Sequence, residues 1–246
     1  MKVKILGISG SPRHGNTDIL VKESLEAAEE LRDVETEFIS VKDKKIRGGC
    51  LSTYRCFDNP SWTEPCRDYK NDDVNEILLR MVEADGIIVG VPVYWGGLTA
   101  QLKNIIDRSM GLEPLGFPLR NKIGGAIAVA YDRQGGLEGA IAELQRWFLT
   151  HDMILVGVGP ERPKQGIGCY YGVAALQGWP NPVSHSADPE GSLSAVKQDI
   201  VGMTAARFLG KRVAEMAKVI KAGFAQVKGE TAWPYGALKE KPKEGE

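Results

Sequence analysis

The segment GSPRHGNT at residues 10–17 combines glycine, hydroxyl and amide residues at a spacing that could hold a phosphate. It fits the nucleotide-binding pattern G-x-x-x-x-G-K-[ST] at every fixed position but one, because Asn16 stands where the lysine would be. That lysine reaches the outer phosphates of a nucleoside triphosphate, so its absence argues against such a ligand. The spacing of Gly7, Gly10 and Gly15 also differs from the dinucleotide pattern G-x-G-x-x-G. The loop is better suited to a single terminal monophosphate.

Short polar side chains and one arginine in this loop could contact such a phosphate. Gly10 and Gly15 would let the backbone approach it closely, and the amides at the start of the following helix would face an anion. Arg13 could place a charged guanidinium on the phosphate or stack on a ring. The same residue types occur in ordinary turns, so a turn without a ligand stays open as an alternative. The candidate phosphate contacts are Ser9, Ser11, Arg13, Asn16 and Thr17.

Two further segments combine glycine with aromatic residues and could border a flat ring. PVYWGG at residues 92–97 is stiff and aromatic, and its glycines permit a close backbone approach. AYDRQGG at residues 130–136 is again rich in glycine. One loop for a phosphate and two for a ring describe a site for flavin mononucleotide (FMN), although aromatic residues at strand ends also serve in packing. The candidate ring contacts are Pro92, Val93, Tyr94, Trp95, Gly96, Ala130, Tyr131, Arg133, Gly135 and Gly136.

Apolar runs that alternate with amphipathic stretches would place these loops at one edge of a sheet. The expected strands cover residues 3–9, 35–41, 85–95, 122–131 and 153–159. The expected helices cover residues 16–32, 73–84, 97–110, 136–151 and 193–222. This order predicts an α/β fold, a doubly wound parallel sheet of five strands with helices on both faces. Ligands of such sheets bind beyond the carboxyl ends of the strands, where the three loops would lie.

The composition bounds the size and the partners of the protein. The 246 residues carry 31 Lys and Arg against 32 Asp and Glu, so no basic field recruits nucleic acid or a membrane surface. No run approaches the roughly 20 apolar residues of a membrane span, and we expect a cytoplasmic protein. We expect one domain over residues 1–222 with insertions at 42–72 and 159–191. Residues 223–246 would form a C-terminal extension, disordered in the polar tail 239–246.

The motifs GSPRHGNT, EADGIIVGVPVYWGGLTAQLKNIIDR and GGLEGAI together resemble those of the NADPH-dependent FMN reductases, more narrowly of the iron–sulfur flavoproteins and multimeric flavodoxin-like quinone reductases. The resemblance extends over residues 3–221 and is weakest in 42–72 and 159–200. It implies a flavodoxin-like sheet of order 2-1-3-4-5 and non-covalent FMN in the three loops. It also implies assembly as a homodimer or homotetramer.

The resemblance implies an oxidoreductase that passes electrons from NAD(P)H to a quinone, a flavin or another small-molecule acceptor. The chemistry belongs to the flavin, so no catalytic side chain is required. The alternative is an electron carrier of the iron–sulfur flavoprotein type that accepts electrons from ferredoxin. Rapid bleaching of the flavin by NAD(P)H would favour the enzyme, and inertness to both nicotinamides would favour the carrier. The acceptor and the choice between NADH and NADPH are not readable from the sequence.

Three cysteines in the 42–72 segment form a second signature, and one departs from the family's pattern. Cluster-bearing relatives carry C-x-x-C-x-x-C and a further cysteine before an acidic pair. Cys50 and Cys56 match the first and third positions, Thr53 replaces the second, and Cys66 would be the fourth. Three thiolates are one short of the set a [4Fe–4S] cluster takes. The cluster is lost, which we favour, or persists with another fourth ligand, or the thiols bind zinc or form a redox pair.

Overall fold

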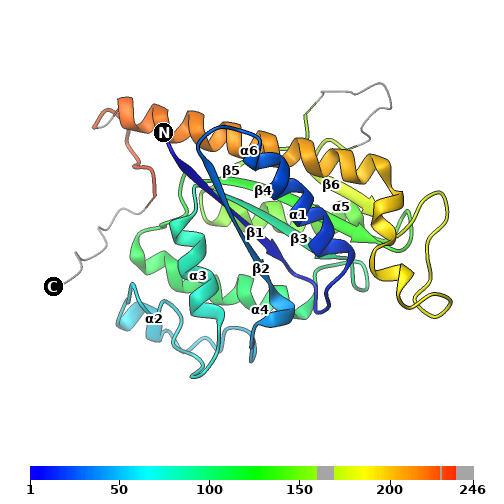
Figure 1. Cartoon of the computed structure of the whole chain (residues 1–246). Helices are drawn as coiled ribbons and strands as arrows, with labels where there is room; N and C mark the ends of the chain where they lie inside the picture. Colours follow the sequence, from blue (N-terminus) through cyan, green and yellow to red (C-terminus); the bar gives the residue numbers. More distant parts are fainter. Residues whose placement is uncertain (160–168, 228, 237–246) are drawn as a thin grey trace.

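Four of the expected strands lie side by side in the centre of the protein, in a computed structural model that describes residues 1–159, 169–227 and 229–236 (Figure 1). They are parallel, and the order β2-β1-β3-β4-β5 is the predicted one. Because β3 and β4 are apolar along their length, they suit a sheet covered on both faces. The strands are β1 (Val3–Ser9), β2 (Val34–Ser40), β3 (Gly86–Pro92) and β4 (Ile123–Ala130).

Two short strands lie beside β4 at the edge of the sheet, where we predicted a single fifth strand over residues 153–159. β5 (Ile154–Leu155) pairs with the start of β4, and β6 (Val173–Leu176) pairs with its end, from Ile127 to Ala130. The sheet therefore has six strands, and the predicted fifth strand was too long. Two residues after β5, Gly157 lies against the returning segment, where an added Cβ would lie 2.1 Å from the Tyr170 carbonyl oxygen.

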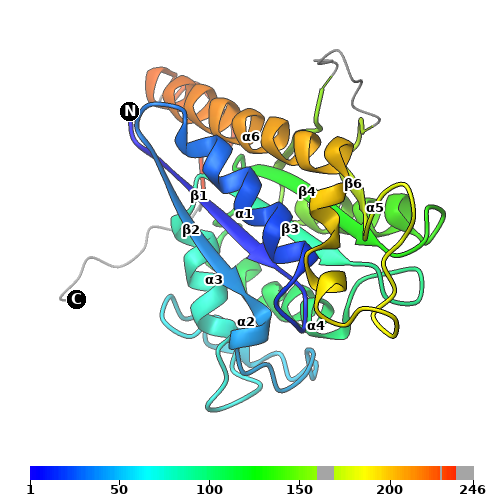
Figure 2. The same cartoon turned by 45° about the vertical axis from the view of Figure 1, so that its right-hand side comes forward.

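The helices cover both faces of the sheet (Figure 2). α1 (Asn16–Glu29) and α6 (Ile200–Gln226) pack on one face, in a core cluster with Val3, Ile5 and Ile88. The opposite face carries α3 (Val74–Glu83), α4 (Ala100–Arg108) and α5 (Leu137–Thr150), which pack on Leu6 and Ile8. Within the described ranges, no helix has the length and apolar character that crossing a lipid bilayer would require.

Close packing of α1 on the sheet explains two glycines inside the strands. A Cβ on Gly7 would lie 2.6 Å from Val21 of α1, and a Cβ on Gly90 would lie 2.5 Å from the same side chain. Real Cβ atoms do not approach so closely, so a larger residue would push α1 outward.

Short helices fill the connections, and one long helix starts later than expected. α6 begins at Ile200 rather than at 193, because Asp199 caps it by accepting a hydrogen bond from the Gly202 amide at 3.0 Å. It then continues to Gln226, beyond the predicted end at 222. The short helices are η1 (Val41–Asp43), α2 (Arg55–Asp58), η2 (Ser109–Leu115), η3 (Gly191–Leu193) and η4 (Ala195–Gln198).

The C-terminal extension returns to the amino ends of the strands, away from the predicted loops. The Tyr235 hydroxyl donates to Asp85 Oδ1 at 3.0 Å, and the Gly236 amide donates to the Arg120 carbonyl at 3.0 Å. The Arg120 guanidinium also lies 4.8 Å from the centre of the Trp233 ring. The tail 239–246, which we predicted to be disordered, lies outside the described residues.

His151, just after α5, is a buried neutral histidine. Ser109 Oγ donates to the Ile106 carbonyl at 2.6 Å, so it accepts from Trp147 Nε1 at 2.9 Å and from His151 Nε2 at 2.8 Å. The hydroxyl has one proton, and this pattern therefore assigns the imidazole proton to Nε2. Nδ1 is buried and has no hydrogen-bond partner among the residues that the structure describes. Burial lowers the pKa of His151 to about 4.

We expect acid to destabilise the fold through His151. Between pH 6.5 and 4 the unfolded chain takes up a proton on this side chain and the folded chain does not, so the free energy of unfolding falls as the pH falls. The full effect is about 3 kcal/mol. Urea unfolding between pH 6.5 and 4 measures the free energy of unfolding at each pH. We expect this free energy to fall less steeply with falling pH for His151→Gln than for the wild-type protein. The control His185→Gln, at an exposed site, should keep the wild-type slope; equal slopes in all three proteins would contradict the expectation.

Candidate functional site

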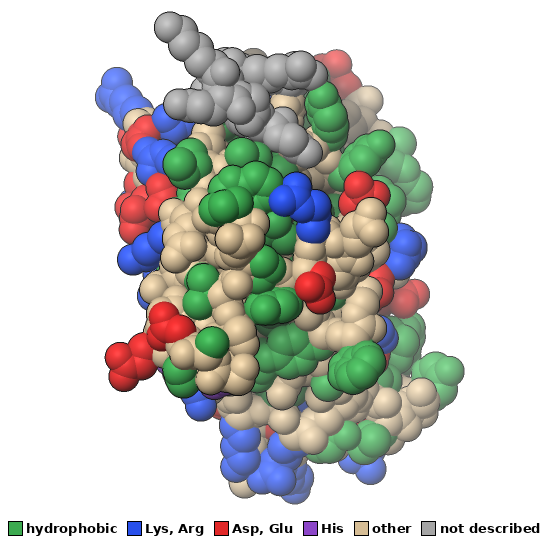
Figure 3. All heavy atoms as spheres, turned by 90° about the vertical axis from the view of Figure 1, so that its right-hand side faces the viewer, with side chains coloured by type: hydrophobic (Ala, Val, Ile, Leu, Met, Phe, Trp, Pro, Cys, Tyr) green, Lys and Arg blue, Asp and Glu red, His purple; other side chains and the backbone are tan. Residues whose placement is uncertain are grey.

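The three predicted loops lie together at the carboxyl edge of the sheet and line one cavity. Hydrophobic side chains and uncharged polar or backbone atoms occupy much of the centre of this face, and most charged side chains lie toward its margins (Figure 3). The loops come from the ends of β1, β3 and β4, which are neighbours in the sheet. The cavity is lined by Ser11, Arg13, Gly15, Asn16, Thr17, Pro92, Val93, Tyr94, Val129, Ala130, Tyr131 and Gln177.

The loop between β1 and α1 is held in shape by its own backbone and by α4. The Gly10 amide donates to the Gly90 carbonyl at 2.7 Å, and Thr99 Oγ1 donates to the Gly10 carbonyl at 2.6 Å. Ser11 Oγ donates to the Arg13 carbonyl at 2.5 Å, which closes the turn. The amides of residues 16–18 open α1 and have no acceptor within the described part of the chain. They are free to donate to an anion.

The side chain of Asn16 lines the cavity and also has two hydrogen-bond partners within the protein. We placed it among the phosphate donors, but its Nδ2 donates to the Ser192 carbonyl at 2.7 Å. Its Oδ1 accepts from the Val196 amide at 3.0 Å. Asn16 therefore fastens the η3–η4 segment against the start of α1, and its backbone amide is what remains for a ligand. No local pattern in the sequence predicts that Asn16 bonds to Ser192 and Val196, which lie far along the chain.

Ser9 and His14, at the two ends of the first half of this loop, lie in different surroundings. Ser9 is fully buried at the end of β1 and does not line the cavity. Its Oγ has no hydrogen-bond partner in the described ranges of the chain. His14 Nδ1 lies 2.8 Å from Asp18 Oδ2 and its Nε2 lies 3.0 Å from Asp43 Oδ1. The hydrogen bond to Asp18 raises the pKa of His14. His14 thus links the loop to η1, and both of its ring nitrogens are engaged.

The two predicted ring loops touch each other through glycine backbones. Tyr94 and Gly97 exchange backbone hydrogen bonds at 3.0 and 3.1 Å across a two-residue turn. Trp95 and Gly96 both adopt positive φ angles, 48° and 81°, in that turn. A Cβ on Gly136 would lie 2.8 Å from Gly96 Cα and from Gly96 O. The contact requires glycine at 136, whose φ of 99° also favours glycine.

The remaining predicted ring contacts lie around the cavity rather than in its lining. Trp95 is fully exposed at the tip of its turn. The Arg133 guanidinium lies 4.4 Å from the centre of the Trp179 ring, and Gly135 sits in the turn that opens α5. Gln177, which we did not predict, joins the lining because its amide donates to the Ala130 carbonyl at 2.9 Å. Only the pairing of β6 with β4 places it there.

A family model described as NADPH-dependent FMN reductase matches residues 3–159, which include the three cavity loops. The chain belongs to this family.

An iron–sulfur flavoprotein of Methanocaldococcus jannaschii is 43% identical over 220 residues, which cover 89% of this chain and 100% of the relative. An NAD(P)H dehydrogenase (quinone) of Chromohalobacter salexigens is 30% identical over 158 residues, 61% of this chain and 72% of the relative. Among solved structures, a flavodoxin, a WrbA-like protein from Agrobacterium tumefaciens, matches with a TM-score of 0.55 at 16% identity. That match covers 89% of this chain and 99% of the other, and it shows a flavodoxin-like fold.

This member of the FMN reductase family brings three of its cysteines to one small cavity. Cys50, Cys56 and Cys66 line it together with Thr53 and Arg108. Burial raises the pKa of the Cys56 thiol, and the nearby sulfurs of Cys66 and Cys50 raise it further. Among the described residues, no three His, Cys, Asp or Glu side chains are placed to bind one metal ion together.

The fourth cysteine does not complete the set. Cys169 packs in the core cluster on the α1–α6 face of the sheet, where its Sγ donates to the Ala174 carbonyl at 3.6 Å. At the position of the missing cysteine, Thr53 Oγ1 donates to Asp68 Oδ1 at 2.5 Å. The four-cysteine cluster site that the resemblance implies therefore does not fit the described part of this chain.

Proposed function

We propose that this protein is an FMN-dependent oxidoreductase that passes electrons from NAD(P)H to a quinone, a flavin or another small acceptor. The observation that supports it most is the single cavity formed by the three loops. One loop offers helix amides that have no acceptor in the described part of the chain, which suit a phosphate. The other two loops offer aromatic side chains and glycine backbone, which suit a ring.

The residues present fit FMN in particular. The amides of residues 16–18 with Ser11, Arg13 and Thr17 would hold the phosphate, and no lysine is needed for a monophosphate. Tyr94 and Tyr131 would flank the flavin ring, with Gly96 and Gly136 allowing the backbone to approach it. Bound FMN would supply the hydride and electron transfer chemistry, and the protein would supply position and electrostatics. The backbone amides of residues 95 and 96, at the tip of the turn closed by Tyr94 and Gly97, would favour a reduced, more negative ring.

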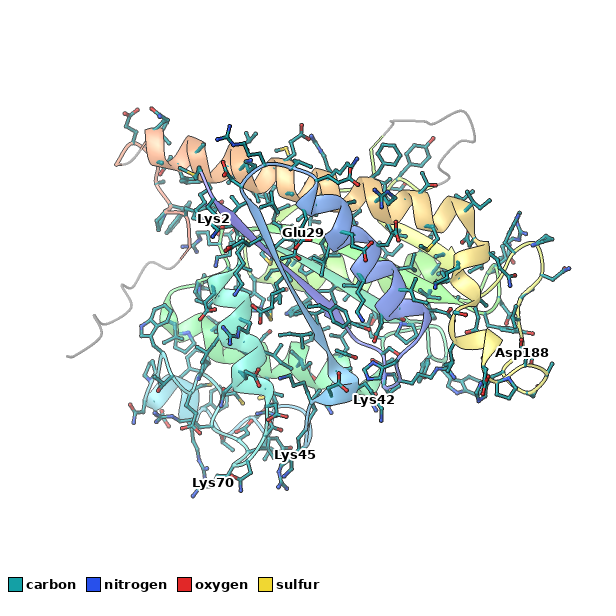
Figure 4. The ribbon with its side chains drawn as sticks, viewed as in Figure 1. Lys2, Glu29, Lys42, Lys45, Lys70 and Asp188 are labelled. Atoms are coloured by element: carbon teal, nitrogen blue, oxygen red, sulfur yellow. The ribbon has the colours of Figure 1, made fainter. Side chains whose placement is uncertain are left out.

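A second proposal differs from the first in the electron donor, which would be ferredoxin instead of NAD(P)H. An electron carrier that accepts electrons from ferredoxin is favoured by the three-cysteine cavity and by the charge around it. Lys42, Lys45 and Lys70 are exposed and lie at the end of the molecule that carries the cysteine segment (Figure 4). Such lysines would suit an acidic protein partner. We place the nicotinamide route first because the cavity loops need no partner protein to work.

The test begins with anaerobic protein that carries stoichiometric FMN, mixed with NADPH or NADH while the flavin absorption is followed. We expect bleaching within seconds by one nicotinamide, followed by reoxidation on addition of a quinone. Free FMN at the same concentration serves as the control and should bleach far more slowly. Inertness to both nicotinamides, together with reduction by reduced ferredoxin, would instead support the carrier. Failure to bind FMN at micromolar concentration would overturn both proposals.

A further inference from the structure

His14, in the loop between β1 and α1, lies between two carboxylates. Its Nδ1 is 2.8 Å from Asp18 Oδ2 in the first turn of α1, and its Nε2 is 3.0 Å from Asp43 Oδ1 in η1. A neutral imidazole donates from one nitrogen only, so its other nitrogen would face a carboxylate oxygen with no proton between them. An imidazolium donates from both nitrogens. The geometry therefore favours the protonated, positively charged form of His14.

Asp18 depends on this positive charge because its own carboxylate is buried. Its side chain is 6% exposed, and its Oδ1 has no hydrogen-bond partner in the described ranges. Its Oδ2 forms an ion pair with His14 and with no other residue that the structure describes. A buried carboxylate without a counter-charge is costly, whereas Asp43 is exposed and solvated. Loss of the proton from His14 would therefore leave the charge of Asp18 unbalanced.

The position of Asp18 lets its charge act on an anion bound at the start of α1. The amides of residues 16–18, which have no acceptor in the described part of the chain, are the proposed phosphate donors. The Asp18 side chain does not line the cavity, so its charge would repel a phosphate through the protein and not by contact. Such repulsion is stronger through a buried region than through water, because the effective dielectric constant is lower.

We propose that the imidazolium of His14 neutralises Asp18 and so allows the amino end of α1 to accept the doubly charged phosphate of FMN. This inference rests on the proposed function, because it requires FMN at this helix. His14 does not line the cavity, so it is a positioning residue that acts through Asp18. In the pattern G-x-x-x-x-G-K-[ST], a lysine adds positive charge to the site. Here Asn16 replaces that lysine, and His14 instead cancels a negative charge beside the site.

The charged neighbours of His14 indicate the pH range in which it should lose its proton. Arg13 lines the cavity and Lys42 in η1 is exposed (Figure 4); neither pairs with Asp18 or Asp43 among the described residues. The hydrogen bond to Asp18 raises the pKa of His14, and the charges of Asp43 and Asp18 raise it further. A phosphate monoester has its second pKa near 6, so FMN is mostly a dianion at pH 7. Changes in FMN affinity between pH 7 and 9 therefore report on the protein.

Fluorescence titration with FMN and with riboflavin between pH 7 and 9 tests the proposal. We expect the wild-type affinity for FMN to fall roughly 10-fold over this range, because the charge of Asp18 becomes unbalanced. Riboflavin lacks the phosphate, so its affinity should change by less than about 2-fold. The riboflavin control also reports on Lys122, whose pKa burial lowers to about 8, at the opposite edge of the sheet. His14→Gln should bind FMN about 10-fold more weakly at pH 7, with little further change up to pH 9.

Asp18→Asn separates the charge of this pair from its structural role. The variant keeps an oxygen that accepts from His14 but removes the negative charge. It should bind FMN at least as tightly as the wild-type protein at pH 7, without the loss at pH 9. In the Asp18→Asn background, His14→Gln should weaken FMN binding no further, so the two substitutions are not additive. A merely structural role for His14 would give the same loss of affinity in both backgrounds and would overturn the inference.

Proton uptake on binding gives a second readout that needs no variant. A bound phosphate would favour the protonated form of His14, so the wild-type protein should take up part of a proton when it binds FMN at pH 8. A pH indicator in weakly buffered solution measures this uptake, and riboflavin binding should show none. The inference is overturned if FMN and riboflavin show the same pH dependence and the same proton uptake. Absence of FMN binding at every pH would instead overturn the proposed function.

Discussion

Asn16→Asp is expected to weaken FMN binding by at least about 100-fold, which corresponds to about 3 kcal/mol. The new carboxylate would lie at the start of α1, where the phosphate is proposed to bind, and two negative charges would share one site. One of its oxygens would also replace the Nδ2 that donates to the Ser192 carbonyl at 2.7 Å, so that two acceptors would face each other. Removal of a buried partner in this way is itself costly. Quenching of flavin fluorescence measures the affinity.

Riboflavin and a second variant separate the two causes of this loss. Riboflavin lacks the phosphate, so its affinity for Asn16→Asp should fall by less than about 10-fold if charge repulsion dominates. Asn16→Ala removes both hydrogen bonds to the η3–η4 segment without adding charge, and it should weaken FMN binding to an intermediate degree. Equal losses of FMN and riboflavin in Asn16→Asp would show that the phosphate does not bind at this helix.

Gly136→Ala is expected to weaken the binding of both FMN and riboflavin by roughly 10- to 100-fold. It should also lower the free energy of unfolding by about 2–3 kcal/mol. The added Cβ would lie 2.8 Å from Gly96 Cα and O, and the residue would have to keep a φ of 99°. The turn of residues 94–97 would move away from the start of α5. Because these two loops are proposed to hold the ring, the loss should be the same with and without a phosphate on the ligand.

Gly139→Ala is the matched control in the same helix. A Cβ there would lie 3.6 Å from Gly96 O, which is an ordinary contact, and the residue lies inside α5. Alanine should stabilise the helix by up to about 1 kcal/mol and leave flavin affinity unchanged. Thermal unfolding and fluorescence titration of both variants test the pair. Wild-type affinity in Gly136→Ala would remove these two loops from the proposed ring site.

Much of the fold was predictable because the signals for it are local. GIIVGV, within β3, is apolar throughout, and a parallel strand buried on both faces requires this. Strands alternate with helices along the chain, which limits the topology to a few forms. The carboxyl ends of neighbouring parallel strands meet at one edge, so the three glycine-rich loops could be expected to share a cavity. The residues that line it include most of those predicted.

The fifth position of the sheet was not predictable in its details. β5 has 2 residues and β6 has 4, and runs this short show no period that separates a strand from a loop. What makes residues 173–176 a strand is the pairing of Val173 with Ile127 and of Leu176 with Ala130. The same pairing places Gln177 in the cavity. The segment between β5 and β6 is long, and its length did not indicate where the chain would rejoin the sheet.

By itself, the amino-acid sequence determined the kind of site, since residue type and spacing decide which groups a loop can offer to a phosphate, a ring or a metal. Only the tertiary structure decided which groups are free to act. Asn16 is committed to Ser192, 176 residues away, and Cys66 receives a hydrogen bond from Arg108, 42 residues away. A side chain's role depends on the hydrogen bonds and charges around it, and those neighbours are brought together by packing of the whole chain rather than by nearness in sequence.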